Sequence, residues 1–326
     1  MKAITLKAFG GTENMQLAEV ETPSPTDDQI LIRVHATSVN RPDVIQRQGN
    51  YPPPPGDSEI LGLEVAGIVE SAGEKCSRFK AGDRVFALVG GGGYAEYALA
   101  LEGHCMAIPE SLSFEQAACI CETYITAYLN LFLLGEVQGK DSVLIHGGGG
   151  GVATAAIQLC KALTPATEVI VTASSGKIER VGNQGADHVI DYKTEDFAEE
   201  IKRIREKRGV DVILDHIGAK YLESNLKSLA LYGRLLLIGV MGGIKAEINL
   251  AMVMVKRQQI IGSVLRSRPV AEKAAIIAQF EQTVMPLFAA GSIAPLVDAT
   301  FPLSEAAKAH DLMEQGGHFG KIVLLP

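Results

Sequence analysis

The most informative stretch of the sequence is Val143-Leu144-Ile145-His146-Gly147-Gly148-Gly149-Gly150-Gly151-Val152-Ala153, where a short apolar strand runs into five glycines. A helix is predicted to follow, over residues 152–162. Gly148, Gly150 and Ala153 have the G-x-G-x-x-G/A spacing, which combines a tight turn, close approach of the backbone to a pyrophosphate and tight packing of helix on strand. A flexible glycine loop would show the same run, but the flanking strand and helix favour a dinucleotide site. The residues expected to contact the dinucleotide are Gly148, Gly149, Gly150, Gly151 and Val152.

Strand-like and helix-like segments alternate from residue 142 onward. This alternation predicts an α/β fold with a doubly wound parallel sheet that is covered by helices on both faces. Thr194 is expected to begin one helix, because acidic residues follow it and basic residues lie towards the helix end, as the helix dipole favours. The strands are expected at residues 142–146, 168–172, 188–191, 210–215, 234–238 and 259–264.

The first 110 residues are rich in short strands and predict a partly open β-barrel. The strands are expected at residues 29–34, 63–70, 83–89 and 94–100. A run of four prolines, Pro52 to Pro55, forms neither helix nor central strand, so it predicts a stiff surface loop with Tyr51 at its base. Ser113-Phe114-Glu115-Gln116 has the spacing of a capping box and is expected to open a long apolar helix.

The C-terminal segment is expected to return to the barrel, because a completed six-stranded sheet has no room for it. It predicts a helix from residue 270 to about 290, a second helix capped by Ser304, and a last strand at residues 321–325. The predicted domains are therefore residues 1–122 with 267–326, and residues 123–266.

The composition excludes several classes of protein. The 326 residues carry 30 Lys and Arg against 38 Asp and Glu, and the net charge of −8 has the wrong sign for a general binder of nucleic acid or anionic membranes. The five cysteines are unevenly spaced and form no disulfide framework of the secreted kind. No window has the roughly 18 uninterrupted apolar residues of a membrane span. We therefore expect a cytoplasmic protein.

The second strand of the α/β half predicts which dinucleotide binds. A site for NAD usually carries Asp or Glu at the end of this strand, where the carboxylate accepts from the ribose 2′-hydroxyl. Here the strand is followed by Ser174, Ser175 and Lys177, with no carboxylate at that place. Hydroxyl groups and a cation suit a 2′-phosphate, so the sequence predicts NADPH. In the other interpretation, Lys177 is merely a solvated residue at a helix start.

Several segments together give the whole chain a family resemblance. They are residues 38–43 (SVNRPD), 46–51 (QRQGNY), 62–67 (GLEVAG), 92–97 (GGYAEY), 265–268 (LRSR) and 320–324 (GKIVL). The chain resembles the zinc-independent quinone oxidoreductases of the medium-chain dehydrogenase/reductase superfamily, the relatives of zeta-crystallin. The resemblance implies a GroES-like barrel domain with a Rossmann domain inserted into it, NADPH bound between the two, and a homodimer built through the Rossmann sheets.

The resemblance also implies where the site residues lie. Asn40 and Tyr51 flank the segment that the family places beside the nicotinamide, and both are candidates for catalysis. The Tyr51 phenol could donate a hydrogen bond or a proton to the reduced oxygen. The Asn40 amide could in addition bind the cofactor. Further cofactor contacts are expected at Thr126, Tyr192, Ile238, Gly239, Val240, Leu265, Arg266 and Lys321.

Each candidate has a structural interpretation too. Tyr51 can simply pack on the proline run, and Asn40 can simply cap a helix. Thr126 in an apolar helix can bond to its own backbone, and a salt bridge at the rim of the cleft would account for Arg266 or Lys321 equally well. Separately, Asp43 is expected to pair with Arg47 at i+4 on a short helix.

The positions that carry zinc ligands in metal-dependent members of the superfamily lack them here. Asn40-Arg41-Pro42-Asp43 and Gly62-Leu63-Glu64 offer neither the Cys nor the His, and Cys105 is the only Cys between Phe79 and Glu115, where four would form a structural zinc lobe. We therefore expect no metal.

Without a Lewis acid, the hydride must go to an acceptor that is already electrophilic. The sequence thus favours NADPH-dependent reduction of a quinone. The alternatives are reduction of the double bond of an α,β-unsaturated carbonyl and, from a different class, a non-catalytic NADPH-bound structural or RNA-interacting protein.

Overall fold

The computed structural model describes residues 1–326, which divide into two compact units. Unit 1 comprises Met1–Ile125 and Arg266–Pro326, and unit 2 comprises Thr126–Leu265. Unit 2 is thus an insertion between two parts of unit 1.

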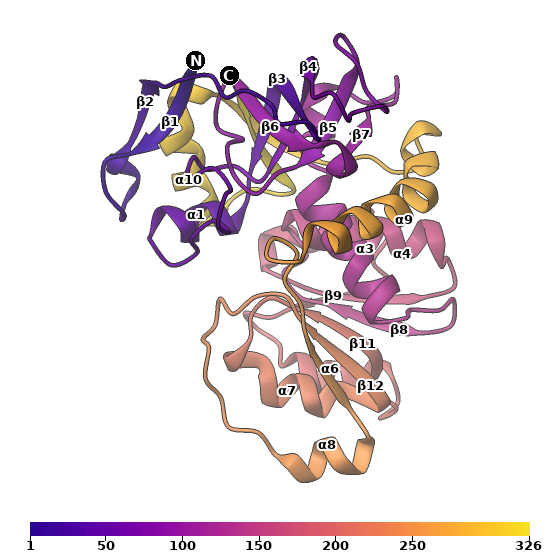
Figure 1. The fold of residues 1–326 in the computed structure, drawn as a ribbon. Coiled ribbons are helices and arrows are strands. Elements are labelled where there is room, and N and C mark those ends of the chain that lie inside the picture. Colours follow the sequence, from indigo (N-terminus) through magenta and orange to yellow (C-terminus); the bar gives the residue numbers. More distant parts are fainter. The chain divides into compact units, whose positions relative to one another are not determined.

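Unit 2 is built on a six-stranded parallel sheet with the order β10-β9-β8-β11-β12-β13 (Figure 1). The strands are β8 (Ser142–Ile145), β9 (Glu168–Ala173), β10 (His188–Asp191), β11 (Val210–Asp215), β12 (Leu229–Leu237) and β13 (Gln259–Gly262). The strand order reverses between β8 and β11, and ligands bind at such a switch point, at the carboxyl ends of the strands. The predicted doubly wound α/β fold is confirmed.

The helices of unit 2 cover the sheet through apolar side chains. They are α3 (Thr126–Tyr128), α4 (Gly151–Leu163), α5 (Ile178–Asn183), α6 (Phe197–Ile204), α7 (Leu222–Ser228) and α8 (Leu250–Lys256). Phe197 and Ile201 of α6 share one core with Leu144 of β8 and Ile213 of β11. Successive side chains of a strand point to opposite faces, so Val143 and Ile145 face the other side. Both are completely buried, so both faces of the sheet are covered.

Unit 1 is built on a seven-stranded, mostly antiparallel sheet. Its path is β14-β15-β3-β4-β5-β7, and β6 pairs with β3. Those strands are β3 (Gln29–Val39), β4 (Glu64–Ala72), β5 (Arg84–Leu88), β6 (Tyr97–Leu101), β7 (Cys105–Ala107), β14 (Val297–Pro302) and β15 (Lys321–Leu325). A separate hairpin pairs β1 (Lys2–Leu6) with β2 (Met15–Glu19). The eleven residues of β3 pair with β6 in their first half and with β15 in their last three residues, so this strand joins the two ends of the unit.

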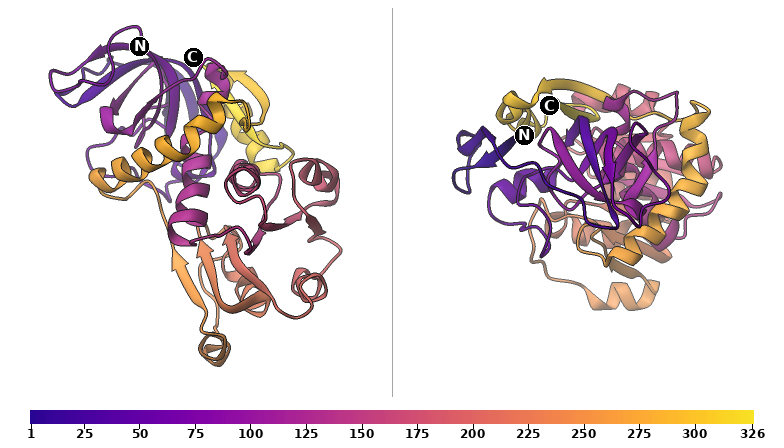
Figure 2. Two further views of the ribbon diagram at one scale, coloured as in Figure 1. Left: turned by 90° about the vertical axis from the view of Figure 1, so that its right-hand side faces the viewer. Right: turned by 45° about the horizontal axis from the view of Figure 1, so that its top comes forward.

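The C-terminal segment lies against the first strands, as Figures 1 and 2 show in yellow beside indigo. The helices of unit 1 are α1 (Arg41–Arg47), α2 (Phe114–Ala117), α9 (Val270–Ala289) and α10 (Ala306–Gln315). Val39, Ile322 and Leu324 form a core cluster with Ala306 and other residues of α10. The last strand occupies the predicted residues 321–325.

Helix starts were predicted with mixed success. The capping box at Ser113 is confirmed, since its hydroxyl accepts a hydrogen bond from the N–H of Gln116 at 3.2 Å. Two predictions were wrong. Asp196, not Thr194, caps α6, and its carboxylate accepts from the N–H of Ala198 at 2.8 Å. Ser304 lies inside a 3₁₀ turn that leads into α10.

The helical run Phe114–Leu134 is long and apolar enough to cross a membrane by length and composition alone. However, 72% of its most apolar window is buried inside the protein. A core helix of a soluble protein has this character, and the run includes two π-helical stretches, Cys121–Ile125 and Leu129–Leu134.

Candidate active site

The glycine loop of unit 2 is held in a single shape by the strands around it. Gly147 has a φ of +69°, which favours glycine, and a Cβ built on it would lie 2.4 Å from the His216 ring. The N–H of Gly148 donates to the carbonyl of Thr172 at 2.9 Å, and a Cβ on Gly148 would lie 2.5 Å from Val171. The absence of side chains therefore lets β9 and the loop after β11 close around this turn.

His146, which directly precedes the glycine loop, ties the loop to neighbouring elements through both ring nitrogens. Its Nδ1 lies 2.9 Å from the Thr172 hydroxyl oxygen and its Nε2 lies 2.8 Å from Asn225 Oδ1, while the Asn225 amide donates to Asp215 at 3.0 Å. Burial lowers the pKa of His146 to about 3, so the ring is neutral at physiological pH. The imidazole thus serves as a buried structural link between β8, β9 and α7.

The N-terminus of α4 is the part of the loop suited to an anion. Gly150 is the N-cap residue and offers no side chain, so the first N–H groups of this thirteen-residue helix have no partner within the helix. Lys177 lies over the loop: a Cβ built on Gly149 would be 2.4 Å from its Cδ and 3.0 Å from its Nζ. The loop thus combines helix N–H groups and a cation, the donors that a pyrophosphate or phosphate needs.

Ser174 and Ser175 follow β9, where the 2′-phosphate was expected. The Ser175 hydroxyl donates to Asp191 Oδ2 at 2.5 Å, and this bond lowers the pKa of the Asp191 carboxyl. The sequence analysis missed that β10 brings a carboxylate to this serine. A hydroxyl has one proton to donate, so the Ser175 side chain does not also donate to a phosphate in this arrangement. Tyr192, next along the chain, is 43% exposed.

The loop after β12 carries Ile238, Gly239 and Val240. The N–H of Ile238 donates to the carbonyl of Asp215 at 2.8 Å, which ties this loop to the end of β11. A Cβ on Gly239 would lie 3.1 Å from both the Cβ and the carbonyl oxygen of His216. Close packing within unit 2 thus explains why residue 239 is a glycine. The neighbouring Val240 is half exposed.

Two further cofactor candidates lie near the ends of unit 2. The Thr126 carbonyl accepts a hydrogen bond from the Asn130 amide at 2.8 Å, and Leu265 is buried. Their contacts with a cofactor stay predictions.

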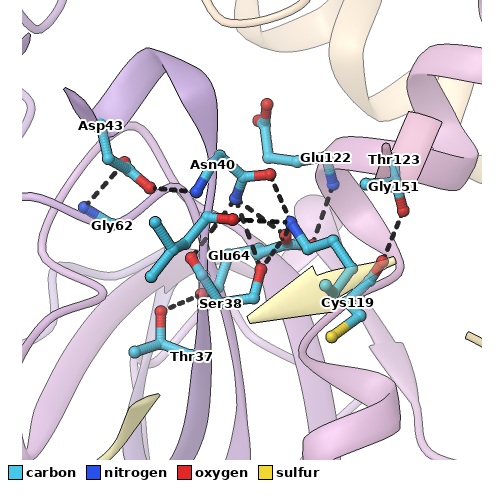
Figure 3. A network of polar contacts seen from close by, with 12 residues as sticks. Thr37, Ser38, Asn40, Asp43, Gly62, Glu64, Cys119, Glu122, Thr123 and Gly151 are labelled. Carbon is cyan, nitrogen blue, oxygen red and sulfur yellow. Dashed lines mark hydrogen bonds and ion pairs between the residues drawn. The ribbon is translucent and has the colours of Figure 1, made fainter. Parts of the chain in front are cut away.

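A buried polar cluster in unit 1 surrounds Glu64 of β4 (Figure 3). Lys321 Nζ from β15 lies 3.1 Å from Glu64 Oε1 and donates to Asn40 Oδ1 at 2.5 Å. The Asn40 amide in turn donates to Glu64 Oε1 at 2.9 Å, and the Ser38 hydroxyl donates to the same oxygen. We call Ser38, Asn40, Glu64 and Lys321 the Glu64 cluster.

The Glu64 cluster corrects one interpretation from the sequence and adds to another. Lys321 forms no rim salt bridge, because its ion pair with Glu64 is almost completely buried. Asn40 is the N-cap residue of α1, as expected, in a capping box with Asp43, and its amide group also binds Glu64 and Lys321. It therefore holds the cluster together.

Asp43 is not paired with Arg47, so that prediction was wrong. Its carboxylate accepts from the N–H of Asn40 at 2.8 Å, from Gly62 at 3.2 Å and from the Tyr94 hydroxyl at 3.2 Å, and burial raises its pKa to about 6. The Arg47 guanidinium turns the other way, towards Glu314 of α10 at 2.8 Å.

Arg266 holds Tyr51 in place. Its guanidinium lies 5.1 Å from the centre of the Tyr51 ring and donates to the Tyr51 carbonyl at 3.3 Å. The same group donates to the Gly90 carbonyl at 2.9 Å and to Gln46 Oε1 at 2.8 Å. Arg266 is buried and its guanidinium donates to carbonyl oxygens, so a rim salt bridge is again the wrong interpretation. Burial, followed by the nearby Glu122 carboxyl, raises the pKa of the Tyr51 phenol.

Glu122 is a site residue that the sequence analysis missed. It is the only charged residue between Gln116 and Gly135, and a lone carboxyl in so apolar a run was a signal that would have found it. Its N–H donates to Glu64 Oε2 at 3.0 Å, while its own Oε1 is buried without a hydrogen-bond partner. Burial, and next the charge of Glu64, raise its pKa to about 8.

The structure contains no group of three or more His, Cys, Asp or Glu side chains arranged to hold a metal ion. Leu63 is completely buried, and Asn40 is engaged in the Glu64 cluster. The resemblance noted from the sequence matches these two positions to zinc ligands, and an amide and an aliphatic side chain are not the Cys and His that such a site uses.

Comparisons with known proteins agree with both halves of the chain. Residues 26–110 match the alcohol dehydrogenase GroES-like domain, and residues 184–324 match the zinc-binding dehydrogenase family. The chain is 37% identical to the quinone oxidoreductase of Rattus norvegicus and 38% identical to that of Sus scrofa, each over 100% of this chain and 98% of the relative. The crystal structure of Escherichia coli quinone oxidoreductase complexed with NADPH matches with a TM-score of 0.89 at 29% identity, over 100% of both chains. With a GroES-like barrel, a Rossmann sheet and full-length relatives of this kind, the chain belongs to the quinone oxidoreductase family of the medium-chain dehydrogenase/reductase superfamily.

Proposed function

We propose that this protein transfers a hydride from NADPH to a quinone without a metal ion. The observation that carries the proposal is the donor set around Glu64. Lys321 and Asn40 bind the buried Glu64 carboxylate with an ammonium and an amide, and the two positions that the family resemblance matches to zinc ligands, Asn40 and Leu63, carry neither Cys nor His. An acceptor that is already electrophilic needs no metal ion to polarise it.

NADPH fits the residues of the glycine loop. The first N–H groups of α4 and the Lys177 ammonium would hold its phosphates, and Ser174 with the backbone after β9 would face the 2′-phosphate. Because Asp191 engages the Ser175 hydroxyl, we assign the preference for NADPH mainly to Lys177. When bound, NADPH supplies the hydride and its two electrons.

Tyr51 is the residue proposed to orient the acceptor. The Arg266 guanidinium lies over the Tyr51 ring and donates to the Tyr51 carbonyl, and both contacts limit the freedom of the phenol. A hydrogen bond from the phenol to the acceptor oxygen therefore costs little entropy. Arg266, Asn40 and Lys321 then act as positioning residues within unit 1, and their direct contacts with the cofactor stay predictions.

The decisive experiment follows NADPH oxidation against a panel of ortho-quinones, para-quinones and α,β-unsaturated carbonyls. We expect turnover with quinones, with NADPH preferred over NADH. Turnover restricted to unsaturated carbonyls would replace quinone reduction by double-bond reduction. No turnover with any acceptor, combined with tight NADPH binding, would favour the non-catalytic alternative.

We also propose a homodimer formed through unit 2. β13 lies at the edge of the parallel sheet, and the neighbouring α8 exposes Leu250, Met254 and Val255 at 71%, 72% and 68%. An open edge beside exposed apolar side chains suits pairing with a second copy. Light scattering should give twice the mass of the chain, and Ile260→Lys on β13 should shift the protein to monomer. All five cysteines are free, which is consistent with the cytoplasm, and we propose this as the location of the protein.

A further inference from the structure

We propose that the side chain of Glu122 is the proton donor that completes reduction of the acceptor. The inference rests on the proposed quinone reduction and names the group that this reaction still lacks. A hydride alone converts a quinone to the hydroquinone monoanion, and one proton must follow.

The side chain of Glu122 differs from the neighbouring carboxyls of Glu64 and Asp43 in its hydrogen bonding. Glu64 is bonded by Lys321 and Asn40, and Asp43 is bonded by two N–H groups and the Tyr94 hydroxyl. Only the backbone N–H of Glu122 joins the Glu64 cluster, and Figure 3 shows its side chain directed away from Glu64. Its Oε1 is buried with no partner, which is costly unless the group has a function.

The surroundings of Glu122 keep it protonated. The charged and titratable groups that face it are Glu64 on β4, Asp43 on α1, Lys321 on β15, Arg266, Tyr51 and the adjacent Cys121. Lys321 and Arg266 favour the ionised form, but Lys321 is already paired with Glu64 at 3.1 Å and compensates a second buried carboxylate only in part. Burial opposes ionisation most and the two neighbouring carboxyls add to it, and the pKa of about 8 means that the acid form prevails at neutral pH.

Glu122 is also placed to serve the acceptor. It acts electrostatically on Tyr51 and Arg266, the pair proposed to orient the acceptor oxygen, and part of the residue remains accessible rather than buried. A carboxyl with a pKa near the working pH is an efficient general acid.

The step balances. The hydride adds two electrons and one hydrogen to the quinone, the O–H bond of Glu122 breaks, and a new O–H bond forms on the negatively charged oxygen of the product. Glu122 is left as a carboxylate, which its neighbours destabilise, so it recovers a proton from water before the next turnover.

The test compares wild type with Glu122→Gln on two acceptors. With a simple para-quinone, whose hydroquinone is a weak acid, kcat/KM should fall about 100-fold in the variant. The wild-type rate should also decline above about pH 8, and the variant should lack this decline. With a tetrahalogenated benzoquinone, whose hydroquinone anion is stable without the proton, the loss should shrink to roughly threefold or less. The uncatalysed reaction with NADPH is subtracted throughout.

Three controls separate proton donation from folding. Glu110→Gln, which changes an exposed carboxyl, should behave as wild type. Binding of NADPH, measured by fluorescence titration, should be unchanged in Glu122→Gln. Glu122→Asp keeps an acid and should keep the decline at high pH with part of the activity, so it carries the test if the Gln variant does not fold.

Equal losses with both acceptors would overturn the proposal in favour of a structural role, and so would an unchanged rate with the simple quinone. A wild-type protein that reduces neither quinone would instead contradict the proposed function itself.

Discussion

Lys321 Nζ and Glu64 Oε1 form an ion pair at 3.1 Å that is buried on both sides and joins residues 257 positions apart in the sequence. Removal of one partner leaves an uncompensated charge in the core, while removal of both leaves none. The pair therefore links the last strand to β4 and sets the electrostatics around Glu122.

Lys321→Met should lower the free energy of unfolding by about 3–5 kcal/mol, because it strands the Glu64 carboxylate. The double variant with Glu64→Gln should recover much of this loss. Urea denaturation of the two single variants and the double variant gives the coupling energy. Additive losses would show that the two groups do not stabilise each other.

Lys177→Ala should weaken NADPH binding about tenfold or more, since a charged hydrogen bond is worth roughly 1.5–3 kcal/mol. NADH binding should be nearly unaffected. Ser175→Ala is the matched comparison: its hydroxyl already donates to Asp191, so the variant should keep most of the NADPH affinity. Fluorescence titration of wild type and both variants with each cofactor measures the affinities, and equal losses of NADPH and NADH affinity in Lys177→Ala would falsify the role of this lysine.

Tyr51→Phe should lower kcat/KM for quinones by an amount worth on the order of 1–3 kcal/mol and leave NADPH affinity intact, because only the phenolic hydroxyl is lost. The ring keeps its contact with Arg266. Steady-state kinetics of wild type, Tyr51→Phe and Tyr51→Ala measures kcat/KM for this comparison. Full activity in the Phe variant, with a large defect in the Ala variant, would restrict Tyr51 to packing.

Asp43 should make stability fall as the pH rises from about 4 to about 6. Its pKa is near 6 in the folded protein and 3.8 in the unfolded chain, so the native state binds more protons in this window. His310 has the opposite effect, because burial lowers its pKa to about 3 and the unfolded chain then binds more protons. The effect of Asp43 is therefore read from the difference between wild type and Asp43→Asn in urea titrations at pH 4 and pH 7. The advantage of the Asn variant should grow by on the order of 3 kcal/mol, and a constant difference would mean that Asp43 titrates normally.

Exhaustive chelation should leave quinone reduction unchanged, since Asn40 and Leu63 replace the soft ligands. Elemental analysis checks the protein before and after treatment. Stoichiometric zinc that leaves together with activity would contradict metal independence.

Local signals in the sequence predicted local structure well. The glycine loop, the strand at residues 321–325 and the cap at Ser113 each depend on a few adjacent residues, and the structure has all three. The fold class followed because the alternation of strand and helix admits few arrangements.

Contacts between distant segments escaped prediction. The expected pair of Asp43 and Arg47 relied on helix spacing, but Arg47 finds Glu314, 267 residues away, and Asp43 finds backbone N–H groups. Glu122 was missed for the same reason, because its meaning comes from Glu64 on another element. Periodicity contains no information about such partners.

The interruption of unit 1 by unit 2 has a consequence for biosynthesis. Thr37, Ser38 and Val39 of β3 pair with a strand that is translated much later, at Lys321–Leu325. At roughly 5–20 residues per second, the ribosome needs tens of seconds to bridge that distance. We expect the compact unit 2 to fold during this interval. Unit 1 stays incomplete, because the end of β3 still lacks β15 as its partner. A nascent chain arrested before Lys321 should therefore carry a protease-resistant unit 2 beside a sensitive N-terminal segment, and this is the interval in which a chaperone has most to protect.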